Sequence, residues 1–183
     1  MKLYEAVTLL VGGVLVAWVG YGLLFESNIE QPSFEKIKNN HQLEIRKYNR
    51  ILMVGHQMSV ENQSFRRLFR YIDGGNQASQ KIPMTAPVID DQSSMMFVMP
   101  DSMEIAPTPN DPSLSVIEEK GLIVAVKSFR GAANQADTIK NDFENELKSK
   151  GVTATGRWFL CQFNSPWVFP LLRKNEIWMV IEI

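Results

Sequence analysis

Two histidines are the residues whose chemistry most readily includes a metal. His41 lies among polar residues ahead of the first expected strand, so we expect it to be exposed. His56 has the strand parity of Leu52 and Val54, which predicts an inward-facing side chain. Imidazole is the commonest metal ligand, but an isolated inward histidine is more often a hydrogen-bonded core residue. No carboxylate partner is near either histidine in the sequence, so any metal stays unknown and His56 is the better ligand candidate.

Sulfur is the second candidate ligand. Four of the 9 methionines cluster, at Met95, Met96, Met99 and Met103. Thioethers can bind haem iron or copper. Met95 and Met96 point to opposite faces of one expected strand, however, so they cannot both reach one site. Core filling is therefore the main interpretation of this cluster.

Catalytic chemistry has little support in the sequence. The chain contains no H-E-x-x-H, G-x-S-x-G, Walker or G-x-G-x-x-G motif. The single cysteine, Cys161, shares strand parity with Phe159 and Phe163, which predicts a buried core residue and not a nucleophile. We expect no catalytic residues and a binding protein, not an enzyme.

Composition limits which classes of protein the chain can belong to. The 183 residues suit one medium domain with an appendage. The formal net charge of -1 lacks the basic excess of nucleic-acid proteins, so no nucleic-acid partner is expected. Aromatic residues make up 10% and charged residues 21%, which favours a folded chain over a disordered one.

The N-terminal appendage has the character of a membrane helix. No charged residue occurs from Ala6 to Phe25, long enough to cross the hydrocarbon core. We therefore predict a transmembrane anchor over residues 1–26. Lys2 precedes the run and Glu26 follows it, so a single-pass topology with the C-terminal domain on the periplasmic side is expected. The alternative is a cleaved signal that releases the domain into the periplasm, but the run is long for a signal and no cleavage site follows it.

Beyond a polar linker at residues 27–32, a domain covers residues 33–183. Its periodicity predicts a strand, an amphipathic helix and two extended segments at residues 43–54, 65–72, 81–88 and 95–99. The apolar face of that helix is expected to consist of Phe65, Leu68, Phe69 and Ile72. The same order recurs at residues 122–129, 136–147, 157–163 and 176–183. Residues 101–112, which contain three prolines, form a loop between the halves. The fold class is thus α+β, with duplicated strand–helix–strand–strand units packed into one body.

Three stretches carry a family resemblance. The first runs from Phe65 to Asn76 and leads into Lys-Ile-Pro-Met-Thr-Ala-Pro-Val at residues 81–88. The second is Ala125–Gly131, and the third pairs Asn164–Trp167 with Arg173–Ile177. Together they resemble the SOUL haem-binding family over nearly everything from Ser33 to the end. The membrane segment lies outside that core.

The resemblance implies a twisted β-barrel-like sheet of eight or nine strands with two flanking helices. It implies non-covalent binding of haem or another porphyrin between residues 61–73 and 164–173, with a role in haem trafficking or buffering. Coordination of the iron varies within the family. Met84 lies in the family motif, where its flanking prolines favour a fixed turn over a ligand role.

That pocket would draw on eight residues. A flat ring would lie against apolar side chains at Phe65, Phe69, Trp167, Phe169 and Leu172. Arg66 and Arg70, four apart on one helix, would meet the propionates, and His56 is the axial-ligand candidate. The competing interpretation is a loop folded onto its own core and arginines on a solvated face.

Two other functions stay open. The duplicated unit also resembles gyrase-inhibitor-like effector-binding domains, some of which hydrolyse small electrophiles. A buried Glu facing a Tyr or Trp between the repeats would favour that alternative. The other alternative is a structural module that docks a partner protein, which an apolar outer patch would favour.

Overall fold

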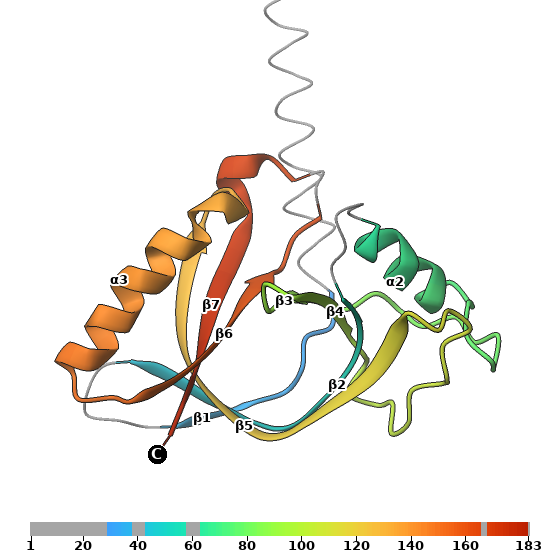
Figure 1. The fold of residues 1–183 in the computed structure, drawn as a ribbon, viewed down its shortest axis with the longest axis horizontal. Coiled ribbons are helices and arrows are strands. Elements are labelled where there is room, and N and C mark those ends of the chain that lie inside the picture. The colour runs from blue at the N-terminus through green and yellow to red at the C-terminus, as the bar shows by residue number, and fades with distance from the viewer. Residues whose placement is uncertain (1–28, 38–42, 58–62, 166–167, 183) are drawn as a thin grey trace, which may run out of the picture.

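The computed structural model describes residues 29–37, 43–57, 63–165 and 168–182. Its elements in chain order are β1 (Glu35–Ile37), β2 (Glu44–Gln57), α2 (Ser64–Ile72), β3 (Val88–Asp90), β4 (Ser94–Val98), β5 (Leu114–Arg130), η1 (Ala133–Gln135), α3 (Ala136–Ser149), β6 (Ala154–Gln162), η2 (Pro170–Leu172) and β7 (Lys174–Ile181). The seven strands form one sheet in the order β1-β2-β4-β3-β6-β7-β5. Because β2 also pairs with β5, the six strands other than β1 close into an antiparallel barrel (Figure 1).

The duplication expected from the sequence is present. The first unit is β2–α2–β3–β4 and the second is β5–α3–β6–β7. Within each unit the sheet order is first, third, second strand: β2-β4-β3 and β5-β7-β6. The units join twice, through β3–β6 and β2–β5. Neither unit closes alone, so the barrel exists only when both halves pair.

The expected strand number was too high for the described residues, which form seven strands and not eight or nine. The reason is that β2 and β5 are unusually long, with 14 and 17 residues. β2 alone covers residues 44–57. Long strands that pair along most of their length must coil to close a small barrel.

A switch of parity accompanies this coiling. Tyr48 and Ile51 of β2 both belong to the interior core, although three residues apart. Opposite them, Gly121 of β5 has a φ of +65°, which side chains with a Cβ rarely adopt. Beyond the switch, Leu52 and Val54 face away from the barrel interior, toward α2.

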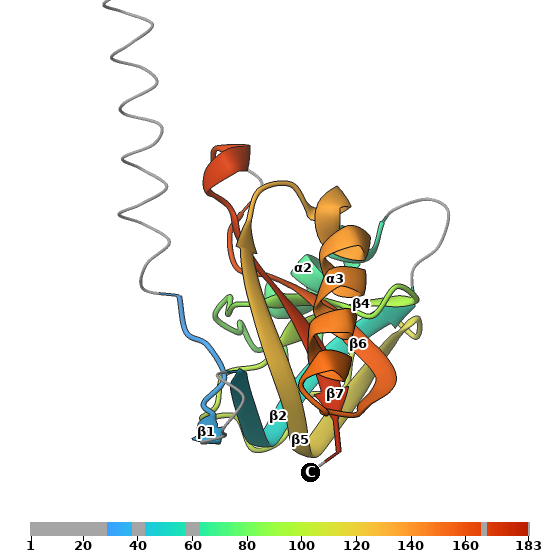
Figure 2. The ribbon, with the colours of Figure 1, turned by 90° about the vertical axis from the view of Figure 1, so that its left-hand side faces the viewer.

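Three apolar cores result. One fills the barrel and includes Tyr48, Phe159 and Trp178. A second lies between α2 and the sheet, and a third lies between α3 and the strands β6 and β7. The two helices sit on opposite sides of the barrel in Figure 1, and Figure 2 looks onto the α3 side. β4 and β7, for example, each have one face toward the interior and one toward a helix.

The helix α3 is as expected, with Ala136, Phe143 and Leu147 buried. The buried face of α2 differs from the expected one. It consists of Ser64, Leu68, Tyr71 and Ile72. Phe65 and Phe69, expected on this face, are 41% and 51% exposed. One flank of α2 is therefore apolar and open to solvent.

The described residues include no helix with the length and apolarity needed to cross a bilayer. The predicted anchor over residues 1–26 lies outside the described residues, as does Trp167. Of the predicted linker, residues 29–32 are described. Ile29 packs against the interior core, and the Glu30 carbonyl accepts a hydrogen bond from the Ala86 amide at 2.8 Å.

Candidate functional site

A buried ion pair lies inside the barrel, where sequence reasoning did not place a site. Arg46 of β2 donates two hydrogen bonds to Glu176 of β7, from Nη1 to Oε2 at 2.8 Å and from Nη2 to Oε1 at 3.1 Å. The two side chains are only 8% and 1% exposed. Such a two-pronged contact is the strongest form of carboxylate–guanidinium pairing.

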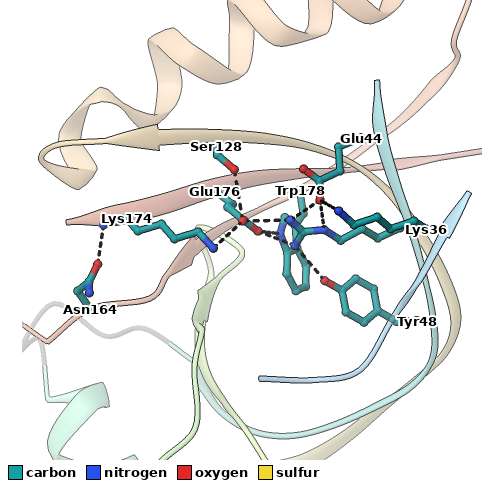
Figure 3. Close-up of polar contacts among 9 residues, drawn as sticks. Lys36, Glu44, Tyr48, Ser128, Asn164, Lys174, Glu176 and Trp178 are labelled. Carbon is teal, nitrogen blue, oxygen red and sulfur yellow. Dashed lines mark hydrogen bonds and ion pairs between the residues drawn. The ribbon is translucent and has the colours of Figure 1, made fainter. Parts of the chain in front are cut away.

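Further groups complete the shell of the Glu176 carboxylate (Figure 3). The Trp178 indole Nε1 donates to Oε2 at 2.8 Å, and the Ser128 hydroxyl donates to Oε1 at 3.3 Å. The Lys174 ammonium lies 3.3 Å from Oε1. Arg46 in turn donates from Nε to Glu44 at 2.9 Å. Every buried side-chain polar atom of the described residues has a partner, so this cluster needs no ligand for its hydrogen bonds.

The electrostatics keep the pair charged. Burial alone raises the pKa of Glu176, but hydrogen bonds from Arg46 and Trp178 outweigh burial and leave the pKa below its usual value. For Arg46, burial acts to lower the pKa, and the Glu176 bond and charge reverse that and raise it. A carboxylate held ionised in this way has no proton to give at neutral pH. Glu176 is therefore a poor proton donor, and both of its oxygens already accept hydrogen bonds from Arg46.

Aromatic rings enclose the pair. Tyr48 stacks on Trp178 with ring centroids 4.8 Å apart, and its hydroxyl accepts from Arg46 Nη1 at 3.4 Å. Burial raises the pKa of Tyr48. Phe34, just before β1, lies over the Arg46 guanidinium at 4.5 Å. The available sequence signal was parity: Glu176 and Trp178 alternate with the apolar face of β7, and barrel closure turns their face inward.

A second candidate site lies beside α2, where Phe65 of that helix meets the Lys81–Val88 motif and the end of β6. It is a groove of about 100 Å³. The groove is lined by Ile29, Phe65, Met84, Thr85, Ala86, Val88, Gln162, Phe163, Asn164 and Ser165. The Phe65 ring meets the Phe97 ring edge-on at 5.2 Å and stacks with the Phe69 ring at 6.4 Å. The start of the loop after β6 thus lies beside α2, and the Lys81–Val88 motif, which was not expected in the pocket, lies there too.

The predicted arginines lie differently from each other. With 3.6 residues per turn, Arg66 projects from the outer side of α2 next to the Phe65 and Phe69 flank. Its guanidinium donates to Gln63 at 3.1 Å, and the side chain is exposed. Arg70 lines a separate cavity together with Arg67 and Asp111. Of the two, Arg66 is therefore the nearer to the apolar flank around the helix.

His56 lies under the start of α2. It is 6% exposed, and its Nδ1 is 2.9 Å from the Ser64 hydroxyl. The parity switch in β2 explains this: the inward face that His56 shares with Leu52 and Val54 is covered by α2, not by the barrel. His56 is not among the residues that line the groove.

Only the start of the loop before β7, at Asn164 and Ser165, lies beside α2. Asn164 and Ser165 line the groove, whereas Val168 is buried and Phe169 and Leu172 are half-buried. Arg130 donates to the Leu172 carbonyl at 2.8 Å, and Arg173 donates to the Val168 carbonyl at 3.0 Å. The first bond ties η2 to the end of β5, and the second lies within the loop. Contacts of Phe169 or Leu172 with a ring remain a prediction.

The remaining ligand candidates are easily placed. Cys161 is fully buried in the interior core, and burial raises the pKa of its thiol, so the prediction of a core residue is confirmed. Met96 and Met99 are buried, and Met95 and Met103 are half-buried beside the core under α2. Among the described residues there is no group of three or more His, Cys, Asp or Glu that could hold a metal ion.

Comparison with known proteins identifies relatives of this sequence. The profile of a family described as SOUL heme-binding protein matches residues 29–180. Heme-binding protein 1 of Mus musculus is 26% identical over 128 residues, which cover 62% of this chain and 67% of the mouse protein. Heme-binding protein 1 of Xenopus laevis is 21% identical over 127 residues, with shares of 62% and 67%.

Solved structures share the fold. The C-terminal domain of EcmrR superposes with a TM-score of 0.57 at 10% identity, over 77% of this chain and 97% of that domain. A structure described as a hydrolase from Listeria innocua gives 0.51 at 9% identity, over 88% and 98%. Identities this low extend the comparison to the architecture alone.

Proposed function

The chain belongs to the SOUL heme-binding protein family, and from this membership we propose that its folded domain captures haem or a related tetrapyrrole at the outer groove beside α2. The observation that carries the proposal is the open apolar flank of that helix. Phe65 and Phe69 are 41% and 51% exposed and lie side by side on the helix, with their rings stacked. Apolar surface of this kind marks binding sites in soluble proteins.

The groove and the neighbouring phenylalanines fit part of a flat, amphipathic ligand. The groove of about 100 Å³ is smaller than the roughly 300–1,000 Å³ typical of small-molecule sites. It can therefore receive only one edge of a macrocycle. The stacked rings of Phe65 and Phe69 supply the platform for the remainder. Arg66 lies beside that platform and would pair with a propionate.

The chain's own contribution is binding and orientation. When bound, haem would supply its iron and the redox chemistry of that iron. The apolar groove would exclude water from one edge of the ring, and Arg66 would set which edge carries the carboxylates. The barrel cluster offers no poised proton donor, which favours a binding role over a catalytic one. Trafficking or buffering of haem is the corresponding proposed role.

We propose a location from the sequence alone. Residues 6–25 would anchor the chain once in a membrane, with the folded domain on the periplasmic side. Protease protection in spheroplasts tests this topology. Degradation of the domain by external protease is the expected result, and full protection would contradict it.

Hemin titration of the full chain tests the binding proposal. Phe65→Ala should weaken binding by about tenfold, since burying a Phe side chain contributes about 1.5–3 kcal/mol. Val116→Ala is the control, because Val116 is similarly exposed at 43% but lies on β5 outside the groove. Equal affinities for wild type and both variants would contradict the proposed site. Failure of the wild type to bind would leave the apolar flank as a surface for docking a protein partner.

One observation favours a second function. Glu176 is a buried carboxylate between the two repeats that accepts hydrogen bonds from Trp178 and Arg46. Arg46 also donates a hydrogen bond to the Tyr48 hydroxyl. A gyrase-inhibitor-like domain would use such a carboxylate toward a small ligand, but here Arg46 already occupies it. A panel of small esters separates the two functions. Turnover by the wild type that is lost in Glu176→Gln, while circular dichroism shows that variant to be folded, would favour the hydrolase, and absence of turnover in the wild type favours binding alone.

A further inference from the structure

We propose that the exposed flank of α2 rests on the anionic surface of the membrane that residues 6–25 would cross. This inference rests on the anchor proposed above, and it does not require that the flank binds haem. The flank consists of Phe65 and Phe69, whose stacked rings are 41% and 51% exposed, and the neighbouring Met84, which is 37% exposed. A flat ring that lies on this flank would then be covered by lipid and not by water.

The length of the chain ahead of the domain supports this position. The uncharged run ends at Phe25, and the first described residue is Ile29. Four residues span at most about 14 Å when fully extended. The headgroup layer alone takes up about 5–7 Å of that distance. With Phe25 at the edge of the hydrocarbon core, Ile29 therefore lies close to the surface of the bilayer.

Ile29 is attached to the domain at the groove itself. Its side chain lines the groove together with Phe65 and packs against the interior core. The next residue is held by two hydrogen bonds. The Glu30 carbonyl accepts from the Ala86 amide, and the Glu30 carboxylate accepts from the Asp101 amide, both at 2.8 Å. The groove and its flank are therefore the part of the domain that so short a connection brings to the membrane.

The charges of α2 suit an anionic lipid surface. The helix contains three arginines and no acidic residue, although the whole chain has a net charge of -1. Arg67 pairs with Asp111 at 2.7 Å. Arg66 and Arg70 are exposed and follow directly after the two phenylalanines, so they project beside them from the helix. Phenylalanines that enter the headgroup layer, next to arginines that meet lipid phosphates, are typical of helices that lie in a membrane interface.

Site-specific labelling of the full chain in lipid vesicles tests the proposal. Phe69→Cys places a fluorescent label on the flank. Asn145→Cys places the control label on an exposed position of α3, on the opposite side of the barrel (Figure 1). The native Cys161 is buried and should not react. In vesicles of phosphatidylglycerol and phosphatidylcholine that contain a nitroxide-labelled lipid, the label at position 69 should be quenched several-fold more than the label at position 145. Equal quenching at both positions, or none at either, would overturn the proposal.

A charge variant tests whether the surface is anionic. Arg70→Glu, made in the Phe69→Cys chain, should lower the quenching at position 69, because it places a carboxylate against lipid phosphates. The difference should shrink in vesicles of phosphatidylcholine alone and at high salt. Unchanged quenching in Arg70→Glu would contradict an anionic leaflet as the occupant of the flank.

Flotation of the same vesicles separates this inference from the proposals on which it draws. A chain that does not float with the vesicles would refute the anchor and this inference together. A chain that floats, with an unquenched label at position 69, would refute this inference alone and leave haem or a protein partner as the occupant of the flank. Neither outcome decides haem binding, which the hemin titration judges separately.

Discussion

The inside of the barrel and the outer flank of α2 differ in whether their side chains already have all their partners within the fold. The interior holds two opposite charges, Arg46 and Glu176, yet each buried polar atom there has a partner. The flank holds no buried charge, yet Phe65, Phe69 and Met84 remain exposed. The polar groups of the interior are therefore satisfied without a ligand, whereas covering the flank would bury apolar side chains that are now exposed to water.

This difference separates stability from binding. A buried ion pair contributes little net stability over apolar packing, but losing one partner is expensive. The pair joins β2 of the first repeat to β7 of the second. The ion pair therefore stabilises the arrangement of the two repeats in which β2 and β7 bring these side chains together. The flank contributes little to folding, so its residues are available for a ligand.

The largest expected effect comes from breaking the interior. Glu176→Gln leaves the Arg46 charge buried without its counter-ion, so the free energy of unfolding should fall by about 3–5 kcal/mol. Urea denaturation followed by tryptophan fluorescence measures it. Glu182→Gln, at an exposed position near the end of the same strand, is the control and should cost less than about 0.5 kcal/mol. A small cost for Glu176→Gln would mean that the pair is not important for the fold.

The opposite pattern is expected on the flank. Phe69→Ala should leave the free energy of unfolding within about 0.5 kcal/mol, because the side chain is half exposed. Hemin affinity should fall by about tenfold as the platform loses one ring. A loss of stability similar to that of Glu176→Gln, with unchanged affinity, would remove the contrast between the two regions.

Acid should weaken the interior ion pair. The folded-state pKa of Glu176 lies below its usual value of 4.5, because hydrogen bonds from Arg46 and Trp178 outweigh the effect of burial. The stabilisation is therefore fully present above about pH 4.5 and is lost as pH falls through the lower, folded-state pKa. Stability measured from pH 7 to pH 3 should fall less steeply in Glu176→Gln than in wild type. Parallel curves would show that other carboxylates govern acid unfolding.

The smallest expected effect concerns the rim charge. Arg66→Glu should weaken hemin binding by a few-fold, and added salt should reduce the difference, since exposed pairs contribute about 0.2–1 kcal/mol. Arg66→Lys, which keeps the charge, should restore most of the affinity. If Arg66→Glu binds as well as wild type at low salt, the propionates lie elsewhere.

Local periodicity predicted the repeated order of elements and the helix α3. The family resemblance predicted that the first helix and the loop after β6 lie together, but not that the Lys81–Val88 motif joins them. Local periodicity did not predict that Glu176 faces inward. Alternation assigns β7 two faces, but only the closure of β2 on β5, a pairing between distant segments, decides that the face with Trp178 is the interior.

His56 and Phe69 show the same limit at single residues. Parity placed His56 on an inward face, but the switch opposite Gly121 turned that face toward α2. On α2, the i, i+3, i+4 pattern included Phe65 and Phe69 in the buried face. Tyr71 and Ser64 took their place because the sheet beneath the helix accommodates them, with Tyr71 donating to the Pro107 carbonyl at 2.8 Å.

The most direct test of where the ligand binds is an amide and indole NMR titration of the full chain with zinc protoporphyrin IX. Binding at the flank predicts that the signals of residues 63–70, 84–88 and 162–165 shift together. The indole Nε1–H of Trp178, which donates to Glu176 inside the barrel, should stay in place. Movement of that indole signal, with the α2 signals unchanged, would put the ligand in the barrel and contradict the account.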